Sequence, residues 1–326
     1  MSRRTLVSAM ASAAFGGILL LYLLLSADVD LAQVERLVLG LRPEGLAEVT
    51  LLLGLNSFLA AEKWRLIDRH LGDPGRPAMP RLIYFAFTAI GVGLGQIVPV
   101  QLSLALCRSI GAHLYGGRGF MRGGTATLFD QFFDLLVAAL LGLASVLVLT
   151  IGGGALTWAF WAFILGVAGL FLYGAAARLV AGAARSLGSL GQGRLCEFCA
   201  NLGLSPLLAP EIGLRLFGIS ALRFLVLVLI GMVSANAAGV EVPLWHLAAS
   251  LPFAVIANAL AITPGGIGIN EWAVTSALFA LGTPFQASAQ WAVVNRVLVA
   301  AGAGLCGIVG FLIAAAAKSS PPRRAV

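Results

Sequence analysis

Long apolar runs recur along the whole chain, separated by short polar clusters. Each run is long enough to cross the roughly 30 Å hydrocarbon core of a bilayer as a helix. Two further apolar blocks, 82–115 and 245–282, are interrupted, the first by "GQIVPVQ" and the second by "AITPGGIGINEWAV". The pattern predicts an all-α polytopic membrane protein without a soluble catalytic domain. The six uninterrupted runs lie at about 5–26, 46–62, 124–150, 156–178, 216–238 and 288–316.

The composition agrees with this pattern. The 326 residues are 60% hydrophobic and 11% charged, with a mean hydropathy of +0.97, whereas soluble domains carry about 25% charged residues. Arg3 and Arg4 followed by an apolar run also resemble a signal peptide, but no clear small-residue cleavage pattern precedes Ala27. We therefore expect a retained first helix.

The distribution of lysine and arginine predicts the topology. Arg3 and Arg4 precede the first run, which indicates a cytoplasmic N-terminus. If each interrupted block is a hairpin that enters and leaves on one side, most of the 21 Lys and Arg residues are cytoplasmic, Lys63 among them. Eight full crossings would instead place Arg118 and Arg122 outside. The charge rule thus favours six transmembrane helices plus two re-entrant broken-helix hairpins in a bacterial inner membrane, with both termini cytoplasmic.

An internal repeat relates the two interrupted blocks. A shift of 165 positions aligns them without a gap and places Pro99 on Pro264. Because the first hairpin opens inward and the second outward, the halves are predicted to be inverted repeats, a plan that recurs in transporters. Simple kinks in packed helices are the alternative. Within a single membrane domain (1–326), the repeats are expected at 46–178 and 216–316, with a cytoplasmic connecting segment at 179–215.

Charged residues at membrane depth are the main candidates for chemistry, because each costs about 2.5–3.5 kcal/mol on insertion scales. They either form ion pairs that pin helices together or line a polar cavity for a lipid headgroup or a proton. The amides of the second break would suit an anionic group, with Arg108 and Arg296 as counter-charges. The candidate substrate-binding residues are Pro99, Arg108, Asp130, Asp134, Pro264, Gly265, Gly266, Gly268, Glu271, Asn295 and Arg296.

Other signals point to no further chemistry. Arg223, near the start of its span, is interpreted as reaching back to the inner interface. The "CEFC" stretch at 196–199 has neither a second cysteine pair nor a nearby histidine, so no metal and no cofactor is expected. The net charge of +7 is spread around apolar spans, which argues against a nucleic-acid partner.

Two stretches resemble a known family. "PGGIGINEWAVTSALFALG" (264–282) and "NRVLVAAGAGLCGIVG" (295–310) are similar to the second-half signature of the lysylphosphatidylglycerol synthase transmembrane region, a flippase-like family that includes the membrane domain of the multiple peptide resistance factor. Asn270 stands where the family has an arginine. The first half matches more loosely, with Ser103 in place of a glycine and Arg108 one position late. The matching positions of the second half are Pro264, Gly265, Gly266, Gly268, Glu271 and Arg296.

The resemblance implies a protein that moves a polar-headed or anionic lipid between leaflets, such as a phospholipid or a polyprenyl-linked sugar. We do not expect an enzyme, because the soluble aminoacyl-transferring domain of fused members has no counterpart here. A non-catalytic membrane partner or scaffold for a lipid- or glycan-modifying enzyme is the alternative function. An integral-membrane transferase is a third, without a donor-binding motif to support it. The expected protein partner is another copy of the chain, in a homo-oligomer, or a lipid-modifying enzyme.

Overall fold

The computed structural model describes residues 3–29, 31–71, 79–116, 120–189, 209–260 and 263–319, and these residues form helices and turns with no strand. The predicted all-α polytopic membrane fold is confirmed. The "CEFC" stretch lies outside the described residues. The helices are α1 (Arg3–Ser26), α2 (Leu31–Leu39), α3 (Pro43–His70), α4 (Arg81–Leu94), α5 (Val100–Gly116), α6 (Phe120–Ile151), α7 (Ala155–Ser189), α9 (Pro210–Ala238), α10 (Leu244–Leu260), the 3₁₀ turn η2 (Pro264–Gly266), α11 (Ile269–Ala280) and α12 (Phe285–Ser319).

Five of the six predicted crossings correspond to helices long and apolar enough to span a membrane, namely α3, α6, α7, α9 and α12. The sixth, α1, has a described apolar part that is shorter, Ala11–Ser26. Prolines at the first positions of α3 and α9 fit helix starts, where a missing N–H costs nothing. The connection between α1 and α3 contains the short helix α2.

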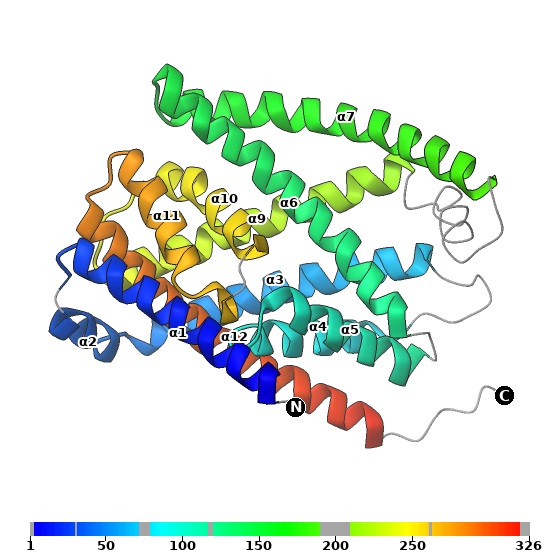
Figure 1. The fold of residues 1–326 in the computed structure, drawn as a ribbon, viewed down its shortest axis with the longest axis horizontal. Coiled ribbons are helices and arrows are strands. Elements are labelled where there is room, and N and C mark those ends of the chain that lie inside the picture. Colours follow the sequence, from blue (N-terminus) through cyan, green and yellow to red (C-terminus); the bar gives the residue numbers. More distant parts are fainter. Residues whose placement is uncertain are drawn as a thin grey trace.

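Both interrupted blocks fold as two packed helices joined at the break (Figure 1). In the first block, α4 ends at Leu94 and α5 begins immediately after Pro99. In the second block, three glycines allow the chain to turn between α10 and α11. Gly265, Gly266 and Gly268 have φ angles of 56°, 71° and 81°, a region that residues with a Cβ adopt at a cost. Whether either hairpin is re-entrant in a bilayer stays a prediction.

The helices of the two halves match each other in order and packing. α6 starts at Phe120 and α12 at Phe285, 165 residues later, the offset that aligns the sequences. Their partners match as well, since α4 packs on α12 and α10 packs on α6. Both contacts rely on small residues and run antiparallel. Gly142 and Ser145 of α6 face α10, and Gly307 and Gly310 of α12 face α4. This correspondence is the one expected of inverted repeats, while the domain limits remain predictions.

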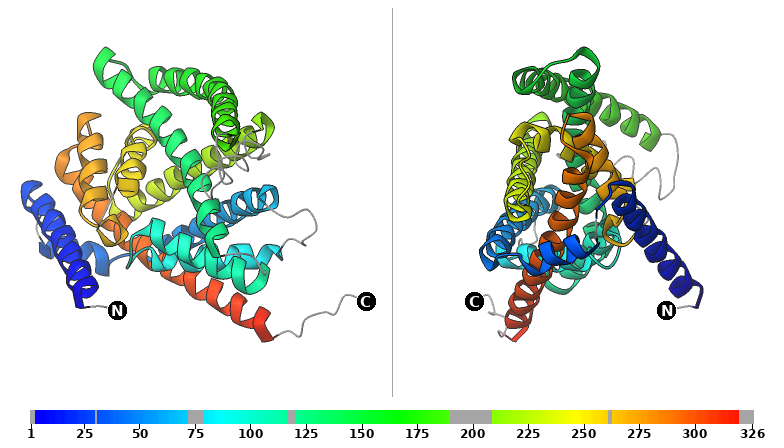
Figure 2. Two further views of the ribbon diagram at one scale, coloured as in Figure 1. Left: turned by 45° about the vertical axis from the view of Figure 1, so that its right-hand side comes forward. Right: turned by 90° about the vertical axis from the view of Figure 1, so that its left-hand side faces the viewer.

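The buried core lies between α3, α4, α9 and α12, with α6 and α10 packed around it. α7 stays at one edge of the bundle in every view (Figures 1 and 2), and only 6% of its apolar stretch is buried. α1 packs on α11 at the other side. α7 therefore faces outward, and the core is formed by the central helices.

Candidate functional site

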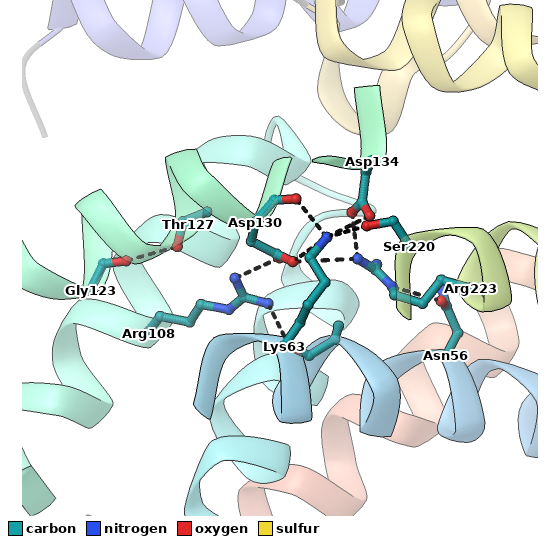
Figure 3. A network of polar contacts seen from close by, with 10 residues as sticks. Asn56, Lys63, Arg108, Gly123, Thr127, Asp130, Asp134, Ser220 and Arg223 are labelled. Carbon is teal, nitrogen blue, oxygen red and sulfur yellow. Dashed lines mark hydrogen bonds and ion pairs between the residues drawn. The ribbon is translucent and has the colours of Figure 1, made fainter. Parts of the chain in front are cut away.

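Four helices bring five charged side chains into one charge cluster, made of Lys63, Arg108, Asp130, Asp134 and Arg223 (Figure 3). Lys63 of α3 lies at its centre and is fully buried. Its Nζ atom is 2.8 Å from Oδ1 of Asp130 and 2.7 Å from Oδ1 of Asp134. The same ammonium donates to Ser220 Oγ at 2.7 Å and to the backbone oxygen of Asp130 at 2.6 Å. One lysine thus joins α3 to α6 and α9.

The two arginines bind opposite ends of the carboxylate pair. Arg108 of α5 donates from Nη1 to Asp130 Oδ2 at 2.7 Å, and its guanidinium lies over the Trp64 ring, 5.5 Å from the centroid. Arg223 of α9 pairs with Asp134, and its Nε donates to Asn56 Oδ1 at 3.0 Å. Arg108 is fully buried, so it holds Asp130 in place from the buried side of the cluster. Arg223 and Asp134 keep exposed fractions of 16% and 24%, so they form the accessible side of the cluster.

The charge cluster holds three cations and two carboxylates, which leaves one excess positive charge. Desolvating an ion costs several kcal/mol even after relaxation, so buried charges need close partners. Each carboxylate has at least two cations within 4 Å. Arg223 and Asp134 are the members of the cluster that keep some exposure.

Two members of the cluster were assigned wrongly from sequence. The apolar run ends near residue 62, which predicts a cytoplasmic position after the span for Lys63. α3 continues to His70, so Lys63 lies about two helical turns before the helix end. Arg223 does not reach back to the interface but pairs with Asp134. Ser220 and Arg223, three residues apart on α9, carried a signal, because that spacing puts polar groups on one helix face.

The second polar group lies at the break between α10 and α11. Glu271 Oε2 accepts a hydrogen bond from the Gly268 backbone N–H at 2.7 Å, which caps the start of α11. Its Oε1 is 3.6 Å from Nε of Arg296, and Arg296 Nη1 donates to the Gly265 oxygen at 2.6 Å. Arg296 thus pairs with Glu271, whereas Asp130 pairs with Lys63 and Arg108. These two side chains hold the broken turn in shape.

The turns of the two hairpins meet at this point. A Cβ atom added to Gly265 would lie 3.0 Å from the Gln96 oxygen and 3.2 Å from the Gly95 oxygen. A cavity of about 150 Å³, the tip cavity, opens between the turns. Its polar lining comes from Gln96, Asn258, Asn270, Glu271, Asn295 and Arg296. Asn270 therefore lines the cavity without adding charge.

A second cavity of about 240 Å³, the cluster cavity, borders the charge cluster. Asp130, Asp134 and Arg223 line it, together with Asn56 and Gln131. Gln96, Val100 and Asn258 line both the tip cavity and the cluster cavity. The two cavities are therefore neighbours, separated by side chains of the two hairpins.

The predicted site residues divide between these places. Gly265, Glu271, Asn295 and Arg296 line the tip cavity, and Asp130 and Asp134 line the cluster cavity. Pro264, Gly266 and Gly268 shape the turn beside the tip cavity. Pro99 marks the first break. Arg108 is buried behind Asp130 and lines neither cavity.

Sequence reasoning missed Asn56, Lys63, Gln96, Arg223 and Asn258. Uncharged amides inside apolar helices give a weak signal, and only the packing of α3, α4 and α10 shows that these amides face one space. Among the described residues, no group of three or more His, Cys, Asp and Glu side chains is placed to hold a metal ion.

Comparison with known families gives one match. The family described as "Lysylphosphatidylglycerol synthase TM region" matches residues 7–317. No curated protein and no solved structure matches the chain.

Proposed function

This chain belongs to the lysylphosphatidylglycerol synthase transmembrane-region family, and from that premise we propose that it moves an anionic lipid headgroup between the leaflets of a membrane. Membership of this family supports a role of the chain that involves membrane lipids. The observation that carries the proposal is the pair of adjoining polar cavities where two helix breaks meet. Broken helices around a central polar site are the arrangement that transporters use to bind polar substrates inside a membrane.

The charges favour a ligand with hydrogen-bond acceptors and one negative charge. The charge cluster carries one excess positive charge, and the Glu271–Arg296 pair is neutral. Two buried donors lining the cavities, Arg296 Nη2 and Gln131 Nε2, have no hydrogen-bond partner within the described structure. A phosphodiester offers acceptor oxygens and a single charge, so it would accept from each donor in the cavity where that donor lies and would balance the excess charge of the cluster.

The acyl chains of such a lipid have an apolar place next to the headgroup. A groove of about 490 Å³ lies between α7 and the helices α6, α9 and α10. Phe224 of α9 lines both this groove and the cluster cavity. The tails would lie under α7 or in lipid, while the headgroup passes between the hairpin turns. Rocking of the two halves would expose the headgroup to either side.

We further propose that the chain is not itself an enzyme and that its substrate is a phospholipid or a polyprenyl-linked lipid of a bacterial inner membrane. The absence of a donor-binding motif in the sequence supports the first point. The basic residues at the N-terminus support cytoplasmic termini.

Leaflet exchange in vesicles tests the proposal. The purified chain is reconstituted with a trace of fluorescent phosphatidylglycerol, and quenching by dithionite reports the fraction of label in the outer leaflet. We expect faster exchange than in protein-free vesicles, and faster exchange of phosphatidylglycerol than of phosphatidylcholine. The scaffold function would be favoured over translocation by two results together. Lipid exchange would be no faster than in protein-free vesicles, and a lipid-modifying enzyme would co-purify with the chain from the native membrane.

A further inference from the structure

A third polar site lies outside both cavities, in the α3–α9 groove. This groove of about 390 Å³ forms where α3 approaches its C-terminal end and α9 has just begun. Arg65 and Arg69 line it from α3, and Arg215 lines it from α9. Lys63 and Arg223 lie elsewhere on the same two helices, within the charge cluster, and do not line the groove. The groove is therefore separate from the proposed translocation path.

Two of the three groove arginines have no counter-charge. Arg65 donates to Glu62 Oε2 at 2.9 Å, and Arg81 lies 3.7 Å from Glu62 Oε1, so this carboxylate is already engaged. Arg69 and Arg215 are exposed and form no ion pair with any residue that the structure describes. Among the residues that the structure describes, the groove therefore carries two positive charges without an ion-pair partner.

The floor of the groove is apolar and continues along the outer face of the bundle. Leu66, Ile219 and Leu222 line it beside the arginines. On α9, exposed Leu222, Leu225 and Leu229 follow Arg215 on the outer face, with the spacing of a continuous helix face. On α3, exposed Leu51, Leu55 and Phe58 precede the charged stretch. Both helices thus change from apolar to cationic at the same level.

A glycine widens the groove at its centre. Gly218 is exposed, and a Cβ atom added there would meet no atom within 4 Å. The backbone of α9 is therefore open to a neighbouring molecule at this position. An acyl chain fits this space, since it needs apolar contact and no hydrogen bonds.

We infer that the α3–α9 groove binds an anionic phospholipid from the leaflet at this end of the protein. Arg69 and Arg215 hold the phosphate, and the acyl chains run past Gly218 along the leucines of α9. Basic pockets between membrane helices are a recognised way to bind anionic headgroups. The inference does not depend on translocation, because the groove lies outside both cavities.

Binding to two matched lipids tests the groove. The full chain in mild detergent is titrated with phosphatidylglycerol or with phosphatidylcholine of the same acyl chains, and the bound lipid is counted by native mass spectrometry. The double variant R69Q/R215Q should bind phosphatidylglycerol roughly thirtyfold more weakly, at about 1 kcal/mol for each arginine. The variant R36Q/R42Q removes the same charge near the N-terminal end of α3 and should bind as tightly as the unmodified chain.

A second variant separates shape from charge. Gly218→Leu fills the groove without changing charge, and it meets open space, so the helix should fold normally. We expect weaker binding of phosphatidylglycerol, with an unchanged elution profile in gel filtration. The assignment is overturned if R69Q/R215Q binds phosphatidylglycerol as tightly as the unmodified chain, or if R36Q/R42Q loses as much affinity as R69Q/R215Q. It is also overturned if inorganic phosphate fully displaces the bound phosphatidylglycerol. Changes in leaflet exchange are measured separately and do not bear on it.

Discussion

At the scale of single residues, the charged groups at the hairpin turn have two tasks at once. Glu271 caps α11 through the Gly268 N–H, and it also pairs with Arg296 beside the tip cavity. A carboxylate inside an apolar stretch is thus explained by the broken turn that it stabilises. Because the same two side chains line the tip cavity, they are also the first to test for transport.

Replacing either partner should stop lipid movement. We expect Glu271→Ala and Arg296→Ala to reduce phosphatidylglycerol exchange to the rate of protein-free vesicles, because each change leaves the other charge unpaired beside the headgroup path. Dithionite quenching measures this, with Glu241→Ala, an exposed carboxylate before α10, as the control. Unchanged exchange in both variants, with folding intact, would remove the tip cavity from the path.

The excess positive charge of the cluster predicts that replacing an acidic member by an uncharged residue destabilises the protein more than replacing a basic one. Asp130→Asn leaves three cations with one carboxylate, so it should destabilise the protein by about 3–5 kcal/mol. Lys63→Met leaves two cations and two carboxylates and should cost less. Thermal unfolding in detergent compares them, and the double variant D130N/K63M should recover part of the loss. Equal losses in the two single variants would show that charge balance does not govern this cluster.

At the scale of elements, the second hairpin depends on its glycines. Gly265 has a φ of 56°, and a Cβ atom there would lie 2.9 Å from Arg296 Nη2. Gly265→Ala should therefore lower stability by about 1–2 kcal/mol, the usual cost of this backbone region for a residue with a side chain. The melting temperature measures it. Gly166→Ala in α7, where an added Cβ meets nothing within 4 Å, should be neutral or stabilising.

Much of this fold was readable from sequence, because apolar length and helix-breaking residues act locally. The runs that became α3, α6, α7, α9 and α12 were predicted, as were both breaks. The polar residues of the site were harder. Lys63 was assigned to a loop because hydropathy ends a span at the first charges, although a helix continues past them. Its burial depends on Asp130 and Asp134, 67 and 71 residues away, and no local pattern contains that information.

The inverted arrangement belongs to the scale of the whole molecule. α4 packs on α12, and the corresponding helices of the second half repeat this where α10 packs on α6. In the proposed transport, these two contacts are the surfaces on which the halves would rock. Gln96 of the first hairpin and Asn258 of the second line both cavities. A headgroup that passes from one cavity to the other must pass these two side chains.

A reversible cross-link between positions 96 and 258 should stop lipid exchange until the link is reduced. The variant Q96C/N258C, treated with a bifunctional methanethiosulfonate reagent, should lose phosphatidylglycerol exchange and regain it after reduction. Each single-cysteine variant, treated in the same way, is the control, because it reports any effect of labelling Cys107 or Cys306, the described native cysteines, both of them buried. Full exchange by the cross-linked protein would exclude this route between the cavities.

The contact between α1 and the second hairpin also has a consequence for biosynthesis. Trp272 donates from Nε1 to the Leu19 oxygen at 2.8 Å, and its ring stacks on Tyr22. The hydrogen bond joins residues 253 positions apart, so at bacterial and eukaryotic elongation rates α11 emerges roughly 13 to 50 s after α1. During that interval α1 has no α11 to pack against. The contact that fixes α1 against the second hairpin can therefore form only after α11 has been made.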